Sequence, residues 1–469
     1  MFKPSFANLA IIAAIAMCRC GGLVDAHAAE RPNIIFLFAD DLGWGDLSCY
    51  GQDRVKTPNL DRLAQQGTLF TNFYVAGSVC SPSRTGIMTG QYPARHRVFG
   101  HFAAEASNAK REMPNALDPD IMTLTDLLKD AGYRTAHFGK WHLGNVSPEE
   151  YGVGAFRTES HTNIPDRGRL DIWNPPNRPK CTADILDAAL EFMDSQQATS
   201  EPFFLNAWFS DPHATLNPSL EQLERVKQFA PKGVDFYGVA QVFYACVVEM
   251  DRQIGRFLDE LDARGLSENT LVIFSSDNGP EDFQIGNSAH SGVGCTGPFR
   301  GRKRSIYEGG IRTPFLLRWP GKVPPGKVND TSIVNGIDLL PTLAAIAEAD
   351  IPASLELDGE NMLDVWLGKD RQRSRPLFWE WRYRVFGHPY NQPPRLAVRE
   401  GDFKLLINPD QSRVELYNLR RDPGERDNIA SEHREKVNQL QAMLLNWNES
   451  LPKSPVEPVA GKANWRWPQ

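Results

Sequence analysis

The chain has 469 residues, of which 41% are hydrophobic and 23% are charged, as is typical of a soluble globular protein with a large core. Its formal net charge of −7 argues against a dedicated nucleic-acid-binding protein. After residue 30 no apolar stretch approaches the length of a membrane span, so we expect no stable membrane-spanning segment.

The first residues have the pattern of a targeting segment. Lys3 precedes the apolar run "LAIIAAIAMC", and "AHA" at residues 26–28 offers small residues for cleavage. We therefore expect a signal peptide over residues 1–28 and an exported protein, in a periplasmic, secreted or lysosome-like compartment. Cys18 raises the alternative of a lipoprotein, although Met17 is a poor residue before a lipidated cysteine. Cleavage leaves five cysteines: Cys49, Cys80, Cys181, Cys246 and Cys295. In an exported protein an odd number indicates that at least one thiol has a fate other than a disulfide within the chain.

Buried strands and amphipathic helices alternate in chain order. The apolar runs at residues 32–41, 202–213 and 270–279 are typical of buried strands. The segments "TPNLDRLAQQG" and "MTLTDLLKDAG" each carry an apolar stripe and a closing glycine, as helices do. This alternation predicts an α/β fold with a large, mostly parallel sheet flanked by helices. In such sheets, ligands bind beyond the carboxyl ends of the strands.

The pattern changes near residue 370. Residues 395–419 show short, partly alternating runs with turn signals, which predict a small antiparallel sheet. A helix pattern over residues 431–447 and a Pro-rich extended tail follow. We therefore expect a main domain over residues 29–368 and a smaller C-terminal subdomain over residues 369–469.

The stretch "FYVAGSVCSPSRTG" places Cys80 before a predicted helix. Ser81 and Pro82 are typical of a helix N-cap and of the first helical position. Cys80 would then lie at a helix N-terminus, where backbone N–H groups favour an anion, and Arg84 would follow about one turn later. From these residues alone, a reactive or anion-binding cysteine and a buried structural cysteine remain equally good interpretations.

Two of the predicted strands end in oxygen-bearing side chains. Asp40 and Asp41 close the first strand, and Asp277 with Asn278 closes the strand over residues 270–279. An acidic pair after one strand is usually a turn or a helix cap. Two such pairs at one edge of a sheet form an all-oxygen set that suits a hard divalent cation, and calcium best.

Other polar stretches are weak signals when each is taken alone. "GKWHLG" at residues 139–144 would turn Lys140 and His142 to the same side of an extended segment. A solvated lysine beside a hydrogen-bonded core histidine is the more common case, and the same holds for His213. The basic, glycine-rich loop at residues 299–314, which contains Lys303, could hold an anion or be merely solvated.

Together these stretches resemble one family throughout. "CSPSRTG" is similar to the signature of the formylglycine-dependent sulfatases, and so are "PNIIFLFADDLGWGDLSCYG", "TPNLDRLAQQGTLFTNFY", "GKWHLG", "SDNG" and "GRKRSIYEGGIRTP". The C-terminal "ELYNLRRDPGERDNIA" is similar to the tail domain of that family. The resemblance covers nearly the whole chain after residue 30 and is strongest to the arylsulfatase A and N-acetylgalactosamine-6-sulfatase branch. It implies an alkaline phosphatase-like fold with its catalytic domain over residues 29–368.

The resemblance also implies how residue 80 and a metal act. A formylglycine-generating enzyme would oxidise Cys80 to the aldehyde Cα-formylglycine, whose hydrate attacks sulfur with one hydroxyl and expels sulfate with the other. A calcium ion would be held by residue 80 together with four oxygen-bearing side chains: Asp40, Asp41, Asp277 and Asn278.

The remaining implied roles fall on five residues. Arg84 would orient the hydrated aldehyde, while Lys140 and Lys303 would hold the sulfate oxygens. His213, alone or with Lys303, would protonate the leaving alcohol. His142 would take the proton from the remaining hydroxyl of the hydrate.

The chain departs from the family pattern after "GKWHLG", where it has "YGVGAFRTESHTN". Ser160 aligns only loosely with a serine that assists catalysis in some relatives. This segment, residues 95–115 and residues 380–395 are expected to form the pocket rim, which decides the substrate. The implied substrate is a sulfated saccharide, such as a sulfated galactose or N-acetylgalactosamine unit, or an aryl sulfate.

Two rival functions remain open. A formylglycine-dependent phosphonate or phosphate ester hydrolase needs the same metal, nucleophile and cationic clamp, so the core motifs discriminate poorly. A non-catalytic binder of sulfated glycans would require loss of the nucleophile or of the metal set, and the sequence retains both.

Overall fold

The computed structural model describes residues 31–196, 201–233, 237–282 and 290–467, together with Met1. Residues 31–469 form one compact unit. The predicted signal peptide and the lipoprotein alternative at Cys18 lie outside the described residues. Within the described part, no helix is long and apolar enough to cross a membrane.

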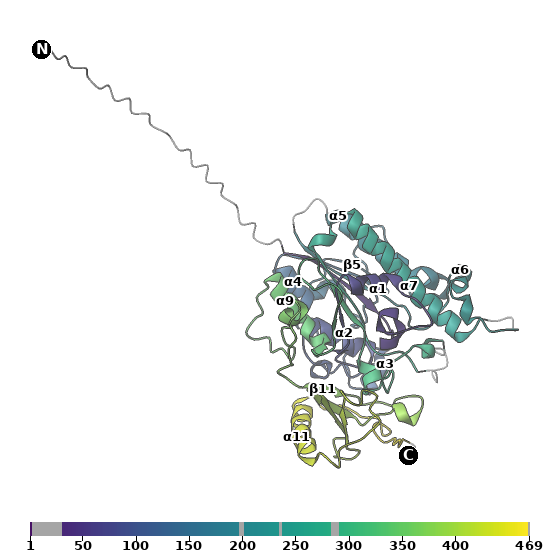
Figure 1. Cartoon of the computed structure of the whole chain (residues 1–469), viewed down its shortest axis with the longest axis vertical. Coiled ribbons are helices and arrows are strands. Elements are labelled where there is room, and N and C mark those ends of the chain that lie inside the picture. The colour runs from purple at the N-terminus through teal and green to yellow at the C-terminus, as the bar shows by residue number, and fades with distance from the viewer. Residues whose placement is uncertain (2–30, 197–200, 234–236, 283–289, 468–469) are drawn as a thin grey trace. The chain divides into compact units, whose positions relative to one another are not determined.

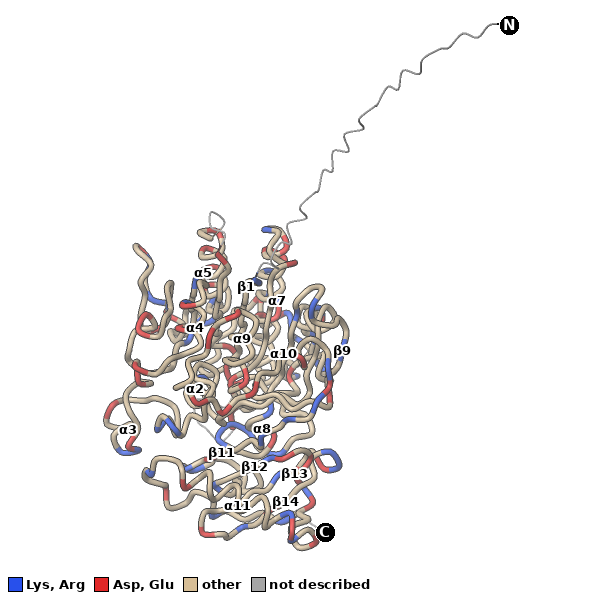
Figure 2. The backbone as a smooth tube through the Cα atoms, turned by 90° about the vertical axis from the view of Figure 1, so that its left-hand side faces the viewer, with Lys and Arg blue, Asp and Glu red and all other residues tan. Residues whose placement is uncertain are grey.

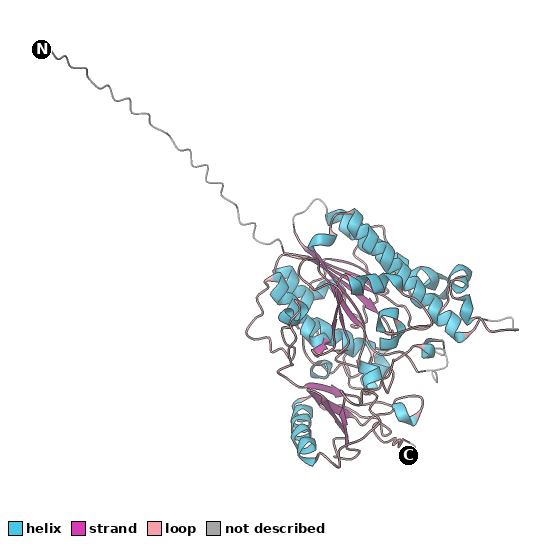
Figure 3. Cartoon of the chain, viewed as in Figure 1, coloured by secondary structure: helices cyan, strands magenta, loops and turns pink. Residues whose placement is uncertain are grey.

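The main sheet has eight strands, seven of which run in one direction (Figures 1 and 3). Strand β8 is antiparallel to both of its neighbours, β7 and β2. From one edge to the other the strands are β5 (Ala155–Thr158), β4 (Arg134–Gly139), β6 (Phe203–Trp208), β1 (Asn33–Ala39), β7 (Thr270–Ser276), β8 (Phe315–Arg318), β2 (Thr68–Phe70) and β9 (Lys327–Asn329). This confirms the predicted large, mostly parallel sheet.

Helices cover both faces of the main sheet, which explains why the central strands β6, β1 and β7 are mostly apolar and buried on both faces. Phe36 and Phe38 of β1 pack into a core with α2 (Cys80–Thr89), α4 (Leu124–Asp130) and α9 (Leu339–Ala347). Ile35 and Leu37 point to the opposite face and pack with α1 (Pro58–Gln65), α5 (Cys181–Gln196) and α7 (Val239–Ala263). Alternate residues of one strand therefore serve two separate cores.

The C-terminal part contains the predicted small antiparallel sheet and its helix. The sheet comprises β11 (Leu377–Glu380), β12 (Leu396–Glu400), β13 (Phe403–Ile407) and β14 (Glu415–Asn418), in that spatial order. Helix α11 (Arg434–Ser450) packs against β12 and β13. Among the four strands of this sheet, β11 is the one that the sequence did not predict. The division of the chain at residues 368 and 369 stays a prediction.

The remaining elements are short and connect these layers: α3 (Glu105–Lys110), α6 (Leu220–Glu224), α8 (Glu308–Ile311), α10 (Leu363–Trp366), β3 (Phe73–Tyr74) and β10 (Val334–Asn335). Figure 2 shows Lys and Arg interleaved with Asp and Glu along much of the described chain. The five cysteines that follow the predicted signal peptide are all free thiols.

The strand order brings distant segments of the chain together. Strands β4, β6, β1 and β7 are neighbours and parallel, so their carboxyl ends meet at one edge of the sheet. Polar residues follow each of them: Lys140 after β4, His213 after β6, Asp40 after β1 and Asp277 after β7. A site at this edge is the arrangement expected of an open α/β sheet.

Candidate active site

Cys80 is the first residue of helix α2 and is buried, with 2% of its surface exposed. The N-cap of the helix is Val79, so the predicted N-cap role of Ser81 is wrong. The Ser81 hydroxyl instead accepts a hydrogen bond from the backbone N–H of Phe102 at 3.0 Å. The Cys80 Sγ lies 3.5 Å from Asp40 Oδ1. Burial raises the pKa of the Cys80 thiol to about 12, in spite of the nearby Lys140 and Lys303 ammonium groups.

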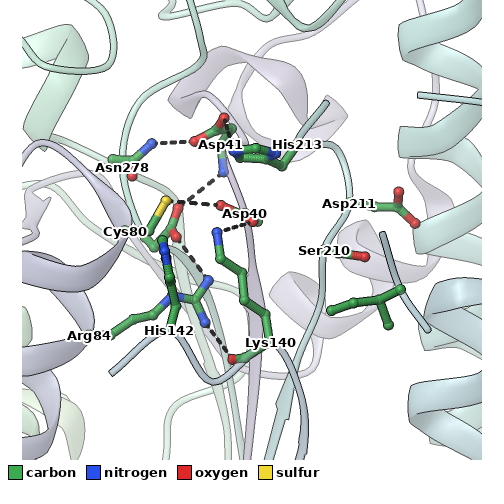
Figure 4. Close-up of polar contacts among 12 residues, drawn as sticks. Asp40, Asp41, Cys80, Arg84, Lys140, His142, Ser210, Asp211, His213 and Asn278 are labelled. Atoms are coloured by element: carbon green, nitrogen blue, oxygen red, sulfur yellow. Dashed lines mark hydrogen bonds and ion pairs between the residues drawn. The ribbon is translucent and has the colours of Figure 1, made fainter. Parts of the chain in front are cut away.

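The four predicted oxygen donors are all buried, and Figure 4 shows Asp40, Asp41 and Asn278 close to Cys80. Asp41 has a φ of 63°, and this turn points its backbone N–H at Asp277 Oδ1, 3.1 Å away. The Asn278 side-chain amide donates to Asp41 Oδ1 at 2.7 Å, while Asn278 Oδ1 is buried without a hydrogen-bond partner. Ligand atoms of Asp40, Asp41, Cys80 and His213 all lie within 4.8 Å of one another.

Three cations neutralise these carboxylates. Lys140 Nζ lies 2.5 Å from Asp40 Oδ2, and Lys303 Nζ lies 2.7 Å from Asp41 Oδ2. Arg84 donates to Asp277 Oδ2 at 2.9 Å and to the Lys140 carbonyl at 3.0 Å. Burial by itself would raise the pKa of Asp40, but Lys140 and the other nearby positive charges together outweigh burial and lower that pKa to about 2.

The backbone fixes where Lys140 starts. Gly139 closes β4 with a φ of 101°, and a Cβ at this position would lie 2.0 Å from the Trp208 carbonyl oxygen. Only glycine permits this close approach, after which the same carbonyl accepts a hydrogen bond from the Lys140 N–H at 2.9 Å. The ends of β4 and β6 are thereby locked together beside the carboxylates.

Two histidines face the same space. His213 Nδ1 lies 2.5 Å from the Ala214 carbonyl, an acceptor that places the proton on this nitrogen. His213 Nε2 lies 3.7 Å from Asp41 Oδ2. His142 lies with its Nε2 3.3 Å from the Phe102 carbonyl, and its buried Nδ1 has no hydrogen-bond partner. Burial lowers the pKa of both imidazoles, so both are neutral at pH 7.

These groups open onto a cavity of about 340 Å³, which is lined by Cys80, His101, Lys140, His142, Glu159, Trp173, His213, Lys303 and Arg304. Arg84 lies behind this lining, fully buried beside the rings of Phe38 and Trp208. The structure therefore brings every predicted site residue to one place, either in the cavity wall or directly behind it.

The sequence prediction missed four lining residues: His101, Glu159, Trp173 and Arg304. His101 and Glu159 fall within segments expected at the rim, and Arg304 falls within the basic loop at residues 299–314, but no motif marks the individual residue. Ser160 is exposed and does not line the cavity, whereas its neighbour Glu159 does. Residues 380–395 also stay out of the lining, although Phe386 lies 5.4 Å from the Arg304 guanidinium.

The comparisons with known proteins agree with this geometry. The Sulfatase family model matches residues 32–349, and the model "N-sulphoglucosamine sulphohydrolase, C-terminal" matches residues 299–450. Arylsulfatase A of Bos taurus is 30% identical, over 93% of this chain and 92% of its own length. An N-acetylgalactosamine-6-O-sulfatase of Bacteroides thetaiotaomicron is also 30% identical, over 89% of this chain and 93% of its own.

A solved structure shares the whole architecture. The crystal structure of Ps i-CgsB in complex with k-i-k-neocarrahexaose superposes with a TM-score of 0.73 at 26% identity, and covers 90% of this chain and 94% of its own. An α/β sheet with buried carboxylates and ammonium groups around a cavity at its strand ends thus characterises the class of protein. The chain belongs to the Sulfatase family, and it is a hydrolase of sulfate esters.

Proposed function

We propose that the protein removes sulfate from a sulfated saccharide by means of a formylglycine at residue 80 and a calcium ion. The observation that carries this proposal is the position of Cys80. It lies in the cavity wall among carboxylates and ammonium groups. A nucleophile is needed there, and a thiol has a single nucleophilic atom, whereas the hydrate of the aldehyde has a second hydroxyl that can expel sulfate.

The residues around Cys80 fit a calcium ion. They offer three carboxylates, and Asn278 Oδ1 is a buried oxygen without a partner, which is the kind of atom that a cation satisfies. Asp40, Asp41, Asp277 and Asn278 would hold the ion together with residue 80. When bound, the ion would acidify a hydroxyl on residue 80 and draw charge from a sulfate oxygen.

Residue 80 supplies the attacking oxygen. Hydration of its aldehyde gives two hydroxyls on one carbon: one bonds to sulfur as the alcohol leaves, and the other, once deprotonated, expels sulfate as the aldehyde re-forms. Arg84 lies one helical turn further along α2 and orients this side chain. Lys140 and Lys303 exchange their carboxylate partners for sulfate oxygens, on which charge develops during the reaction.

The two histidines transfer protons at opposite stages. His213 Nε2 faces the cavity; the negative charge of a bound sulfate ester favours the imidazolium form of His213, which can then deliver its Nε2 proton to the ester oxygen of the departing alcohol, with the Lys303 ammonium beside it as a second donor. His142 is neutral and its Nδ1 lacks a partner, so it can accept the proton of the second hydroxyl. One group therefore acts as an acid and the other as a base.

The substrate and the cellular location are also parts of the proposal. The names of the relatives, together with the resemblance at the sequence level, support a sulfated galactose or N-acetylgalactosamine unit, for which aryl sulfates would be surrogates. The targeting pattern of residues 1–28 supports export, and the modification requires a formylglycine-generating enzyme. N-terminal sequencing of the native protein should begin near Ala29, and an intact Met1 on active protein would contradict export.

Mass spectrometry tests the central claim. The peptide that contains residue 80 should be roughly 18 Da lighter than its thiol form, because –CH₂SH has become –CHO. The same preparation should release sulfate from an aryl sulfate and from sulfated monosaccharides, and should leave an aryl phosphonate intact. Full activity with an unmodified thiol would refute the formylglycine mechanism. Preferred turnover of the phosphonate would favour the alternative of a phosphonate or phosphate ester hydrolase. Binding without any turnover would favour a non-catalytic binder of sulfated glycans.

A further inference from the structure

Part of the cavity wall belongs to loops and not to the charged cluster around Cys80. Trp173 is the most conspicuous residue of this part, because 37% of its surface is exposed. Trp141, Trp208, Trp366 and Trp379 are, by contrast, among the largest fully buried side chains. An indole in a cavity wall lacks the stabilisation that burial in the core would give, and such exposed aromatic surface commonly marks a binding site.

Trp173 adjoins the two residues that handle the sulfate ester. Lys140 Nζ lies over the indole at 5.4 Å from the ring centroid, and the His213 imidazole meets it edge to face at 5.4 Å. A sugar with its sulfate on Lys140 and its ester oxygen near His213 must therefore place its ring beside the indole. The C–H face of a pyranose is apolar and weakly positive, which complements the negative face of an indole.

Glu159 supplies a hydrogen-bond acceptor to the same cavity. Its two carboxylate oxygens accept from the Trp141 backbone N–H at 3.0 and 3.2 Å. A carboxylate has about four acceptor positions, so it retains capacity toward the cavity. Sugar hydroxyl or amide N–H groups can donate to it, whereas a second sulfate at that place would be repelled.

The rim offers little to attract further negative charge. Besides Lys140 and Lys303, the one permanently charged cation among the described lining residues is Arg304, and Glu281 accepts from its guanidinium, with 3.1 Å between Nη2 and Oε2. Burial, aided by Arg111 and other nearby cations, lowers the pKa of His101 to about 3, which leaves that ring neutral. Apart from the sulfate-holding end, the described lining is thus suited to an uncharged sugar ring.

We propose that Trp173 and Glu159 form a subsite for a neutral pyranose that carries a single sulfate. Trp173 packs against the apolar face of the sugar, and Glu159 accepts hydrogen bonds from its hydroxyl or amide groups. This inference rests on the proposed function, since it places the sulfate at Lys140. It makes both residues determinants of specificity: they select monosulfated neutral sugars over disulfated or uronic ones.

Binding measurements test the role of Trp173. In a Cys80→Ser background, calorimetry should show that Trp173→Ala raises the Kd of N-acetylgalactosamine 6-sulfate roughly fivefold to tenfold, and Trp173→Phe less. The Kd of inorganic sulfate should stay within about twofold, because sulfate alone does not reach the indole. Tyr237→Ala, which removes another exposed aromatic ring outside the lining, should change neither value.

Either of two results would overturn that role. An equal loss of sulfate affinity would mean that Trp173 only positions Lys140, and an unchanged sugar Kd would mean that it makes no contact with the sugar. Wild-type protein without turnover of any sulfated sugar would refute the proposed function instead, while the calorimetric comparison would still decide the subsite.

Substrate competition tests Glu159. Wild-type kcat/KM should favour N-acetylgalactosamine 6-sulfate over the 4,6-disulfate by at least roughly tenfold, and Glu159→Gln should narrow this ratio severalfold because it removes the repelling charge. The glutamine retains an acceptor for the Trp141 N–H, so the local fold should persist. An unchanged ratio would show that Glu159 only accepts from the Trp141 N–H and does not influence the substrate.

Discussion

Two clusters of buried charge among the described residues differ in their surroundings: one adjoins the cavity beside Cys80, and the other does not. The first is the site cluster: Asp40, Asp41, Asp277, Arg84, Lys140 and Lys303, at the strand ends of the main sheet. The second is the junction cluster, between α8 and the C-terminal sheet. There Lys404 of β13 lies 2.9 Å from Glu308 Oε1 and 3.0 Å from Glu425 Oε1, and all three residues are fully buried.

The two clusters have similar composition and different surroundings. In the junction cluster Glu425 also accepts from the Glu308 backbone N–H at 2.7 Å, and Arg312 donates to Glu308 at 3.3 Å. None of these residues lines the cavity beside Cys80. The site cluster, in contrast, faces about 340 Å³ of open space. Buried charge by itself therefore does not identify a functional site, whereas open space beside it does.

Replacement of Cys80, which lies beside the site cluster, should have the largest effect on turnover. Cys80→Ser keeps a small side chain at the start of α2, so the melting temperature should change little. In a host that converts only cysteine, turnover should fall by several orders of magnitude, because a single hydroxyl cannot expel sulfate. Cys295→Ser, a thiol outside the cavity, is the matched control and should retain activity. Undiminished turnover of unconverted Cys80→Ser would contradict the mechanism.

Removal of one charge from the site cluster should abolish metal binding. Asp277→Asn retains an acceptor for the Asp41 N–H but loses a charged ligand, so bound calcium and turnover should both fall by at least roughly a hundredfold. Chelation of the wild type should have the same effect on turnover, reversible with calcium. Asp251→Asn changes another buried aspartate and should retain its calcium, as measured by elemental analysis. Full metal content in Asp277→Asn would exclude it as a ligand.

The corresponding change in the junction cluster should affect stability and leave the chemistry intact. Lys404→Met leaves Glu308 and Glu425 buried without their shared cation, and loss of one partner from such a pair typically destabilises by about 3–5 kcal/mol. Denaturant unfolding should show this loss, while kcat of the folded fraction stays at the wild-type value. A large fall in kcat at unchanged stability would place the junction cluster in the catalytic machinery.

A smaller effect should appear as a pH dependence of stability. Burial, together with Glu308, raises the pKa of Glu425 to about 7 in spite of Lys404, compared with about 4.3 in the unfolded chain. The folded state then holds the proton more tightly, so the stability from this group is complete below pH 4 and is lost as the pH rises through 7.

Unfolding measurements between pH 5 and pH 8 would detect this loss. Glu425→Gln should remove this pH dependence. As the pH rises from 5 to 8, the free energy of unfolding of the variant, relative to that of the wild type, should therefore increase by on the order of 2 kcal/mol. Parallel profiles for the two proteins would show that the carboxyl is ionised throughout.

The sequence alone determined the local features of this protein. A continuous apolar run such as residues 32–41 is typical of a strand covered on both faces, which indicates the α/β class, the helices on both sides and the polar residues at the strand ends. The stretch around Cys80 and the strand-end aspartates carry the residue types that the chemistry requires, so the residues of the site can be named from the sequence. The N-cap at Val79 was missed because Ser81 and Pro82 carry the usual local signal, whereas the Ser81 hydroxyl is engaged by Phe102, a tertiary contact.

Only the tertiary structure decided which residues meet. Asp40 and Asp277 share one site because β1 and β7 are neighbours in the sheet, and strand order is set by long-range packing that no local periodicity encodes. The same holds for Trp173 and Glu159, which lie on loops where neither period nor spacing marks one residue among its neighbours. It also holds for the junction cluster: Glu308 and Lys404 are ordinary charged residues in the sequence, and only the fold shows that both are buried without access to substrate.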